Sequence, residues 1–147
     1  MTLKAQISED MKSAMRAKES TRLGTIRLLL AAMKQREVDE RIELSDIDVI
    51  SIIEKMLKQR RDSIAAYESA KRVDLADVEK AEVLVLQGYL PKQLAEEEVA
   101  ALLEKVVADT AAASMKDMGK VMAAIKPLVA GKADMGKISG LIKARLA

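Results

Sequence analysis

Cysteine and histidine are both absent from this chain of 147 residues. Without cysteine no disulfide can form, so the fold does not depend on an oxidising compartment. The two absences also exclude thiol catalysis, zinc sites built from cysteine and histidine, and a serine–histidine–aspartate triad. Any function of this chain must therefore use other side chains.

Aromatic residues are nearly absent as well, since Tyr67 and Tyr89 are the only two. Proteins that bind single-stranded nucleic acid stack bases on aromatic side chains, and two distant tyrosines are a poor platform for stacking. Half of the residues are hydrophobic, a third are charged, and helix formers dominate. This composition predicts an all-α globular fold in which the nine methionines fill core gaps that aromatic rings would otherwise occupy.

Long hydrophobic runs and nucleotide-binding loops are also missing. No apolar run approaches the roughly 20 residues of a membrane span, and the first residues contain no apolar segment typical of a secretory signal. The glycines form neither of the two common phosphate-binding patterns, and no pair of carboxylates is placed for acid–base catalysis. We therefore expect a cytoplasmic protein with no membrane contact, catalytic residue, cofactor or metal.

Hydrophobic periodicity predicts seven helices in two groups. Gly88 and Pro91 interrupt the pattern, and the residue before a proline disfavours the helical conformation, so the boundary is placed at Leu90. Residues 1–90 are predicted to form an N-terminal domain of about four helices, and residues 91–147 a C-terminal domain of three. The predicted helices cover about 3–18, 20–40, 45–70, 75–87, 95–109, 115–130 and 134–146, the third opening with a capping box at Ser45.

Charge is distributed unevenly along the chain. The net charge is +2, but residues 116–147 alone carry +5. A basic segment of this kind can attract phosphate, although a plain solvated helix face explains it equally well. Gly119 and Ala123 stand four residues apart, so we expect them to pack closely against a neighbouring helix, with a backbone contact to a ligand phosphate as the alternative.

A second basic cluster, formed by Lys58, Arg60 and Arg61, lies on the third predicted helix. At about 100° per residue, Arg60 falls only about 40° from the centre of the apolar stripe. A guanidinium in that position needs a carboxylate partner or must extend to water. An ion pair between helices is the favoured explanation, and a joint phosphate contact by the three side chains is the alternative.

Four segments together resemble the GatB/YqeY family. They are Arg-Leu-Gly-Thr-Ile-Arg-Leu-Leu at 22–29, Lys-Gln-Arg-Arg-Asp-Ser-Ile at 58–64, Tyr-Leu-Pro-Lys-Gln-Leu at 89–94, and Met-Lys-Asp-Met-Gly-Lys-Val-Met at 115–122 with Gly-Lys-Ala-Asp at 131–134. Their order and spacing fit from about Leu3 to Leu146. The resemblance implies an all-α protein whose C-terminal part is similar to the tail domain of the B subunit of aspartyl/glutamyl-tRNA amidotransferase.

In that enzyme the tail helps to hold tRNA, so the resemblance implies a tRNA-binding or accessory protein with tRNA or a tRNA-handling enzyme as partner. The family is often labelled as a carbon–nitrogen ligase with glutamine as amido-N-donor. The large catalytic domain of the B subunit has no counterpart here, so the chain is not expected to be an enzyme by itself. The candidate tRNA-binding residues are Lys116, Gly119, Lys120, Gly131, Lys132, Lys137, Lys143 and Arg145.

Two further hypotheses stay open. The first is a helical protein–protein interaction module without nucleic-acid binding, which would dock a partner through the methionines of the C-terminal part. These are Met115, Met118, Met122 and Met135. The second is a component of an amidotransferase that becomes active only with partner subunits.

Overall fold

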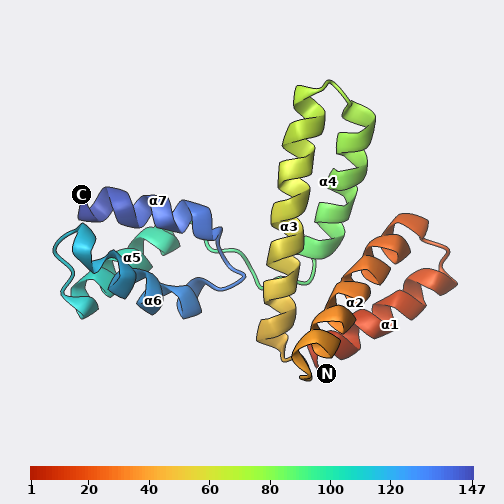
Figure 1. Ribbon diagram of the computed structural model, residues 1–147, viewed down its shortest axis with the longest axis horizontal. Helices are drawn as coiled ribbons and strands as arrows, with labels where there is room; N and C mark the ends of the chain where they lie inside the picture. The colour runs from red at the N-terminus through yellow and green to blue at the C-terminus, as the bar shows by residue number, and fades with distance from the viewer. The chain divides into compact units, whose positions relative to one another are not determined.

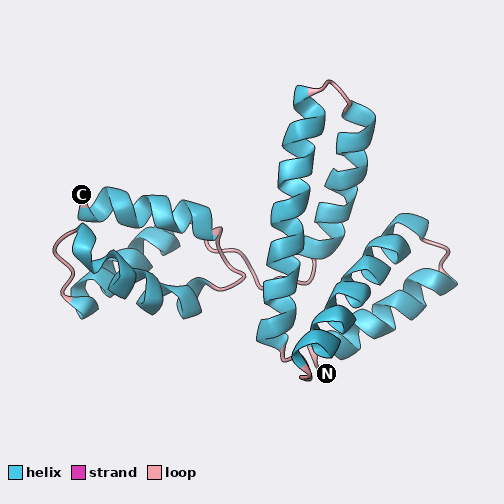
Figure 2. Cartoon of the chain, viewed as in Figure 1, coloured by secondary structure: helices cyan, strands magenta, loops and turns pink.

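The computed structural model describes all residues from Met1 to Ala147, and it is entirely helical (Figures 1 and 2). Seven α-helices and one short 3-10 helix are present, and there is no strand, which confirms the all-α prediction. The chain divides into two compact units, Met1–Leu90 and Pro91–Ala147. No helix is both long enough and apolar enough to span a membrane.

The N-terminal unit consists of two helical hairpins. In Figure 1, α1 pairs with α2 and α3 pairs with α4, and α2 also packs against α4. Every predicted helix in this unit is present, with ends within three residues of the prediction. The helices are α1 (Leu3–Arg16), α2 (Ser20–Glu40), α3 (Asp46–Ser69) and α4 (Val73–Gln87).

Local side-chain chemistry sets the start of two of these helices. The Thr2 hydroxyl accepts a hydrogen bond from the Ala5 amide at α1, which satisfies one free donor of the first turn. At α3, Ser45 accepts from the Asp48 amide while the Asp48 carboxylate accepts from the Ser45 amide. This reciprocal pair confirms the predicted capping box. The hydrogen bonds that the Asp48 carboxylate accepts from the Ser45 amide and hydroxyl lower its pKa.

The core of the N-terminal unit is almost purely aliphatic. Met33 and Met56 are its buried methionines, whereas Met1 and Met15 are exposed, so the predicted role of methionine as core filler holds only for part of the set. Tyr89 packs against the edge of this core as a partly buried ring. The fully buried residues come from all four helices and include Ile7, Ala14, Ile26, Leu29, Val49, Ile53, Leu57 and Leu86.

The C-terminal unit is a smaller bundle with a core of Val, Leu and Ile. Its helices are α5 (Glu96–Thr110), η1 (Met115–Asp117), α6 (Met118–Val129) and α7 (Met135–Leu146). Each of α5, α6 and α7 contributes one buried stripe to the core. Pro127 lies in the last turn of α6, which ends two residues later. The buried residues are Val99, Leu103, Val106, Val107, Val121, Ile125, Val129, Ile138, Ile142 and Leu146.

The turn between α6 and α7 is attached to the segment that leads into α5. Gly131 has a φ of 70°, a conformation that glycine adopts without steric cost. Its carbonyl accepts a hydrogen bond of 2.7 Å from Nε2 of Gln93, and the Lys132 carbonyl accepts one of 2.8 Å from the Leu94 amide. The two bonds join the first segment of this unit to the start of its last helix.

Candidate functional site

The basic residues singled out in the C-terminal unit come from adjoining elements. η1 packs against both α6 and α7, so side chains from these three elements share one part of the unit. Gly131 is the only buried member, and the others are exposed. Lys116 belongs to η1, Gly119 and Lys120 to the first turn of α6, Gly131 and Lys132 to the turn that follows α6, and Lys137, Lys143 and Arg145 to α7.

Two of these residues, Arg145 and Lys120, lie near carboxylates of the same unit. Nε of Arg145 lies 2.7 Å from Oε1 of Glu104 on α5, and this hydrogen bond raises the pKa of Arg145. The pKa of Asp117 is lowered by hydrogen bonds from the Ala113 and Ser114 amides and, to a smaller degree, by the charge of nearby Lys120. These contacts stabilise the bundle and reduce the charge available to a ligand.

Gly119 does not pack against a neighbouring helix, so the favoured prediction for this residue is wrong. It is exposed, as is Ala123, and a Cβ atom built at Gly119 would meet no atom within 4 Å. The buried face of α6 is instead formed by Val121, Ile125 and Val129. The spacing of four residues correctly placed Gly119 and Ala123 on one face, but that face is turned to solvent.

Arg60 forms the ion pair between helices that its position on the apolar stripe predicts. Its Nε lies 2.7 Å from Oε2 of Glu82 on α4, and the two side chains are only 13% and 19% exposed. Nη1 of Arg60 also donates to the Met56 carbonyl. Lys58 and Arg61 point to solvent as exposed side chains. A joint phosphate contact by the three basic residues stays a prediction, and Arg60 is already paired with Glu82.

A cavity in the N-terminal unit brings together residues that the sequence pattern did not single out. It has a volume of about 380 Å³ and opens between α1, α2 and the end of α4. Arg22 and Tyr89 come from two of the segments that carry the family resemblance. The residues that line the cavity are Gln6, Asp10, Arg22, Leu84, Val85, Gly88 and Tyr89.

Polar groups form one side of this cavity. The Tyr89 hydroxyl donates a hydrogen bond of 2.7 Å to Oδ2 of Asp10, although the two residues are 79 positions apart. Nη2 of Arg22 lies 3.9 Å from Oδ1 of Asp10, and its Nη1 lies 3.2 Å from Oε2 of Glu19. Burial and the bond to Asp10 raise the pKa of Tyr89. Hydrogen bonding to Glu19 raises the pKa of Arg22.

The opposite side of the cavity is apolar and open to solvent. Leu84 of α4 lines it with 71% of its surface exposed, and Val85 lies beside it. Val78, also on α4, is 56% exposed but does not line the cavity. The groove is thus lined by the exposed Leu84 and by Val85 together with the Asp10–Arg22 ion pair and the Tyr89 hydroxyl, and such a lining can bind an amphipathic group.

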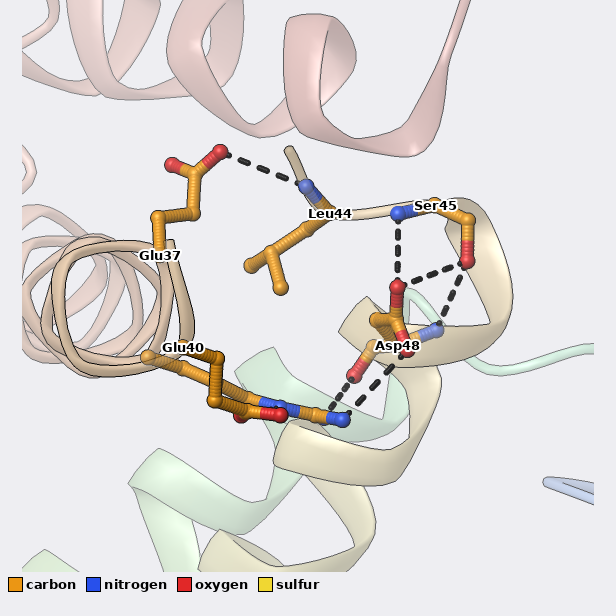
Figure 3. A network of polar contacts seen from close by, with 6 residues as sticks. Glu37, Glu40, Leu44, Ser45 and Asp48 are labelled. Carbon is orange, nitrogen blue, oxygen red and sulfur yellow. Dashed lines mark hydrogen bonds and ion pairs between the residues drawn. The ribbon is translucent and has the colours of Figure 1, made fainter. Parts of the chain in front are cut away.

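A second cavity, of about 530 Å³, lies between α2 and α3, and one of its lining residues, Arg36, forms two ion pairs. Arg36 lies 2.6 Å from Glu40 and 3.4 Å from Asp48, which is itself held by Ser45 (Figure 3). Glu37 accepts from the Leu44 amide in the same view and also pairs with Lys4, which lowers the pKa of Glu37. These contacts fix the α2–α3 turn, so we assign this corner a structural role.

No group of three or more aspartate or glutamate side chains is placed to hold a metal ion.

Of the four methionines considered as a docking surface in the C-terminal unit, Met115 is 44% exposed. Met118, Met122 and Met135 pack against the core of their own unit. The methionines of this unit therefore do not form an open apolar surface.

Relatives of this chain are mitochondrial proteins of fungi. The protein named Altered inheritance of mitochondria protein 41, mitochondrial, is 36% identical over 86 residues in Kluyveromyces lactis, 39% over 97 in Eremothecium gossypii and 34% over 87 in Lachancea thermotolerans. These matches cover 58%, 63% and 58% of this chain, and 46%, 53% and 46% of the relatives. The chain thus spans about half the length of the curated relatives it matches.

These names correct two predictions. They refer to mitochondria and not to tRNA, so the predicted tRNA-linked function is wrong, and so is the predicted cytoplasmic location. The first prediction rested on the resemblance to a tRNA-holding domain together with the basic excess of residues 116–147, in which Arg145 is paired with Glu104 of α5. The second rested on the absence of cysteine and of a signal segment. Neither absence distinguishes one compartment in which disulfides do not form from another such compartment.

The family assignment itself is confirmed across nearly the whole chain. The family model described as Yqey-like protein matches residues 4–146, which includes both compact units and all four segments that carry the resemblance. The all-helical architecture, the capped start of α3 and the cavity at Tyr89 all lie within the matched residues. This chain belongs to the YqeY-like protein family.

Proposed function

We propose that this chain is a helical protein-binding module that holds a partner protein in the groove beside Tyr89. The observation that carries the proposal is the exposure of Leu84, 71% of whose surface faces solvent although it lines a cavity together with Asp10, Arg22 and Tyr89. An exposed leucine beside a concave surface is an anchor point that a partner side chain can cover. Covering it would remove apolar surface from water and favour binding.

The residues around Leu84 indicate that it belongs to a groove and is not an isolated exposed leucine. Val85 and Gly88 extend the apolar edge along α4, while Asp10, Arg22 and Tyr89 close the other side. The hydrogen bond between Tyr89 and Asp10 connects the end of α4 to α1, so the two walls are held together before any partner binds. A preformed groove lowers the entropic cost of binding.

The relatives' names connect those proteins to the inheritance of mitochondria. We propose that this chain acts in a related process through its bound partner. We also propose that residues 1–90, with four helices, and residues 91–147, with three, work as separate domains. The division of the chain into two compact units supports this. Ligand binding by the basic residues of the second unit stays a prediction, and no ligand is assigned to them.

A matched pair of variants tests the binding function. Leu84→Asp places a charge at the groove, whereas Val78→Asp places the same charge on the same helix outside it. The full chain and both variants would be expressed in the cells of origin, purified under mild conditions, and the bound proteins quantified by mass spectrometry. We expect at least one partner to be lost, about tenfold or more, from Leu84→Asp and retained by Val78→Asp.

Circular dichroism and thermal unfolding of both variants provide the control for folding. Both positions are largely exposed, so we expect both variants to unfold within about 0.5 kcal/mol of the unmodified chain. If the two variants retain the same set of bound proteins, Leu84 is not a docking residue and the proposal is wrong. Loss of function in cells with Leu84→Asp alone would link the groove to the biological role.

A further inference from the structure

Opposite charges are separated within the C-terminal unit. Helix α5 carries five carboxylates and a single lysine, whereas residues 116–147 carry a net charge of +5. All six lysines of this basic half are exposed, and none forms an ion pair within the unit, where Arg145–Glu104 is the only pair. They are Lys116, Lys120, Lys126, Lys132, Lys137 and Lys143. An external anion can therefore reach most of this charge.

The neighbouring helices α6 and α7 repeat one sequence pattern. Each follows an aspartate and begins with Met-Gly-Lys, at 118–120 and at 135–137. Each buries its fourth, eighth and twelfth residues, and each has a second exposed lysine at its ninth residue, Lys126 in α6 and Lys143 in α7. Two lysines six residues apart lie about 120° from each other around a helix, so they flank its outer face. The repeat thus builds the same basic surface twice.

The exposed large apolar side chains of this unit lie in the same basic half. Met115, Leu128 and Leu141 are 44%, 44% and 46% exposed, and α5 presents no such side chain. Leu141 follows Lys137 by four residues and Leu128 follows Lys120 by eight, so each leucine lies within about 80° of a lysine on its own helix. A plain solvated helix face does not explain why the exposed leucines are restricted to the basic half.

We propose that η1, α6 and α7 bind the surface of an anionic lipid bilayer, with the lysines at the phosphate headgroups and with Leu128 and Leu141 in the interfacial layer. Each lysine near such a surface adds to the attraction. The lysine stems and the leucines can lie against the upper parts of the lipid chains, which removes apolar surface from water. The carboxylates of α5 are repelled by the same surface, so they determine which side of the unit meets the bilayer.

This activity goes beyond the proposed partner groove, because it belongs to the other unit. Binding at the surface of a bilayer requires no membrane-spanning helix, and none is present. The inference differs from the sequence-based expectation of no membrane contact, which considered only apolar runs and signal segments.

Other anionic ligands fit this surface less well. A nucleic acid would pair its phosphates with the lysines but leave Leu128 and Leu141 in water, and the unit contains no aromatic residue on which a base could stack. An acidic peptide would cover one helix, whereas the lysines occur equally on two. A broad anionic surface that also accepts apolar side chains matches both features.

Cosedimentation of the full chain with lipid vesicles tests the bilayer as ligand. One set of vesicles contains phosphatidylcholine alone, and the other also contains about one third anionic phosphatidylglycerol. At low salt we expect binding to the anionic vesicles to be at least about tenfold tighter, and most of this difference should disappear at about 0.5 M salt, where the attraction is screened. Equal binding to both sets, or no binding to either, would mean that the inference is wrong.

Two matched charge reversals show which side of the unit binds. Lys137→Glu lies in the basic half, and Lys105→Glu makes the same change at an exposed position of α5. Lys137 is the third residue of α7, where a glutamate interacts favourably with the helix dipole, so the fold should be retained. Lys137→Glu should weaken binding to anionic vesicles about tenfold and Lys105→Glu less than about twofold. Similar losses would mean that only the net charge matters, which contradicts the assigned surface.

An introduced tryptophan distinguishes a bilayer from other anions. The chain contains no tryptophan, so Leu141→Trp reports on the proposed interface and Ala101→Trp on an exposed position of α5. With anionic vesicles, the emission of Leu141→Trp should move to shorter wavelength and be quenched by brominated lipid, and that of Ala101→Trp should stay unchanged. Inorganic polyphosphate should cause no shift in either variant.

The outcomes of the tryptophan experiment separate two explanations. If Leu141→Trp shows no shift with vesicles while polyphosphate binds as tightly as they do, the basic half attracts anions in general and the bilayer is not its ligand. A shift in Leu141→Trp alone, together with the loss of binding in Lys137→Glu, supports the inference.

Discussion

The two units of this chain are both all-helical, but different interactions hold them together. In the N-terminal unit, ion pairs connect neighbouring helices at Arg60–Glu82, Arg36–Asp48 and Lys4–Glu37, and Tyr89 bonds to Asp10. In the C-terminal unit, Arg145–Glu104 is the only ion pair, and the core of Val, Leu and Ile provides most of the cohesion.

The difference follows from how the helices meet. Long helices such as α2 and α3, with 21 and 24 residues, bring polar positions into contact near their ends, as at Arg36–Asp48, and along their length, as at Arg60–Glu82. These positions need partners. The helices of the C-terminal unit have 12 to 15 residues and bury a single apolar stripe each. Polar contacts can also line a groove, and in the N-terminal unit Asp10, Arg22 and Tyr89 do so.

The largest expected effect comes from emptying one core. Ile125→Ala in the C-terminal unit and Leu29→Ala in the N-terminal unit each remove a fully buried side chain, at an expected cost of about 3 kcal/mol. Hydrogen exchange should show that each substitution lowers protection in its own unit by far more than in the other. An equal loss of protection in both units would mean that they unfold together. It would contradict the description of two units that are stabilised separately.

A smaller effect should distinguish the two kinds of ion pair. Glu82→Ala leaves the mostly buried guanidinium of Arg60 without its partner, so we expect a loss of about 2 kcal/mol. Glu104→Ala breaks the pair with Arg145, in which the side chains are 59% and 46% exposed, so the loss should stay below about 0.5 kcal/mol. Urea unfolding would measure the free energy of unfolding of both variants. Similar losses would contradict the expected difference between the mostly buried ion pair and the exposed one.

Alkaline pH should weaken the N-terminal unit alone. The pKa of Tyr89 is raised above its ordinary value of 10.0, by burial first and then by the bond to Asp10. The folded chain therefore keeps this proton at pH values where the unfolded chain releases it. The stabilisation is complete below about pH 10 and is lost as the pH rises further.

The free energy of unfolding, measured between about pH 8 and 11, tests whether stability falls as the pH rises. The unmodified chain should lose stability above about pH 10 in the N-terminal unit, and Tyr89→Phe should lose less over the same range. The C-terminal unit contains no tyrosine and serves as an internal control. A Tyr89→Phe variant with an unchanged pH profile would show that the Tyr89 bond does not contribute to stability.

The smallest expected effect is a gain in stability at a helix end. Ala111 closes α5 with a φ of 53°, in the left-handed region that costs residues with a Cβ atom about 1 kcal/mol. Ala111→Gly relieves this cost and should stabilise the C-terminal unit by about 0.5 kcal/mol after the greater entropy of unfolded glycine is included. Lys71→Gly, at a φ of 59°, is the matching variant in the N-terminal unit.

Thermal unfolding of the two glycine variants would measure the gain. Each variant should raise the midpoint of its own unit and leave that of the other unchanged. A lower midpoint for either variant would show that its left-handed residue contributes a contact that glycine cannot replace. Such a result would mean that the side chain at this helix end stabilises its unit through a contact.

Sequence periodicity predicted the helices well because it reports which side of each helix is buried. The predicted third helix at 45–70 is α3 at Asp46–Ser69, and the position of Arg60 on its apolar stripe predicted an ion pair. Gly119 shows the limit of the same reasoning, because two small residues on one face indicate close packing only if that face meets another helix. The apolar stripe of Val121, Ile125 and Val129 is the covered face of α6, and Gly119 and Ala123 lie away from it.

The groove was missed for a related reason. Asp10, Arg22 and Tyr89 belong to three different segments, and no spacing rule connects positions 79 residues apart. Asp10 and Arg22 are ordinary polar residues of their own helices, and Tyr89 lies in the turn that follows α4. One available signal was the presence of Arg22 and Tyr89 in segments that carry the family resemblance, but it did not indicate that they share a site.

The amino-acid sequence by itself determined the helical class, the approximate helix ends and the family. These depend on local preferences and on short-range periodicity, which each segment carries independently of the rest. Only the tertiary structure decided that Arg60 finds Glu82, that Gly119 faces solvent, and that Asp10 meets Tyr89. Such contacts depend on which helix faces pack together, and packing is a property of the whole unit.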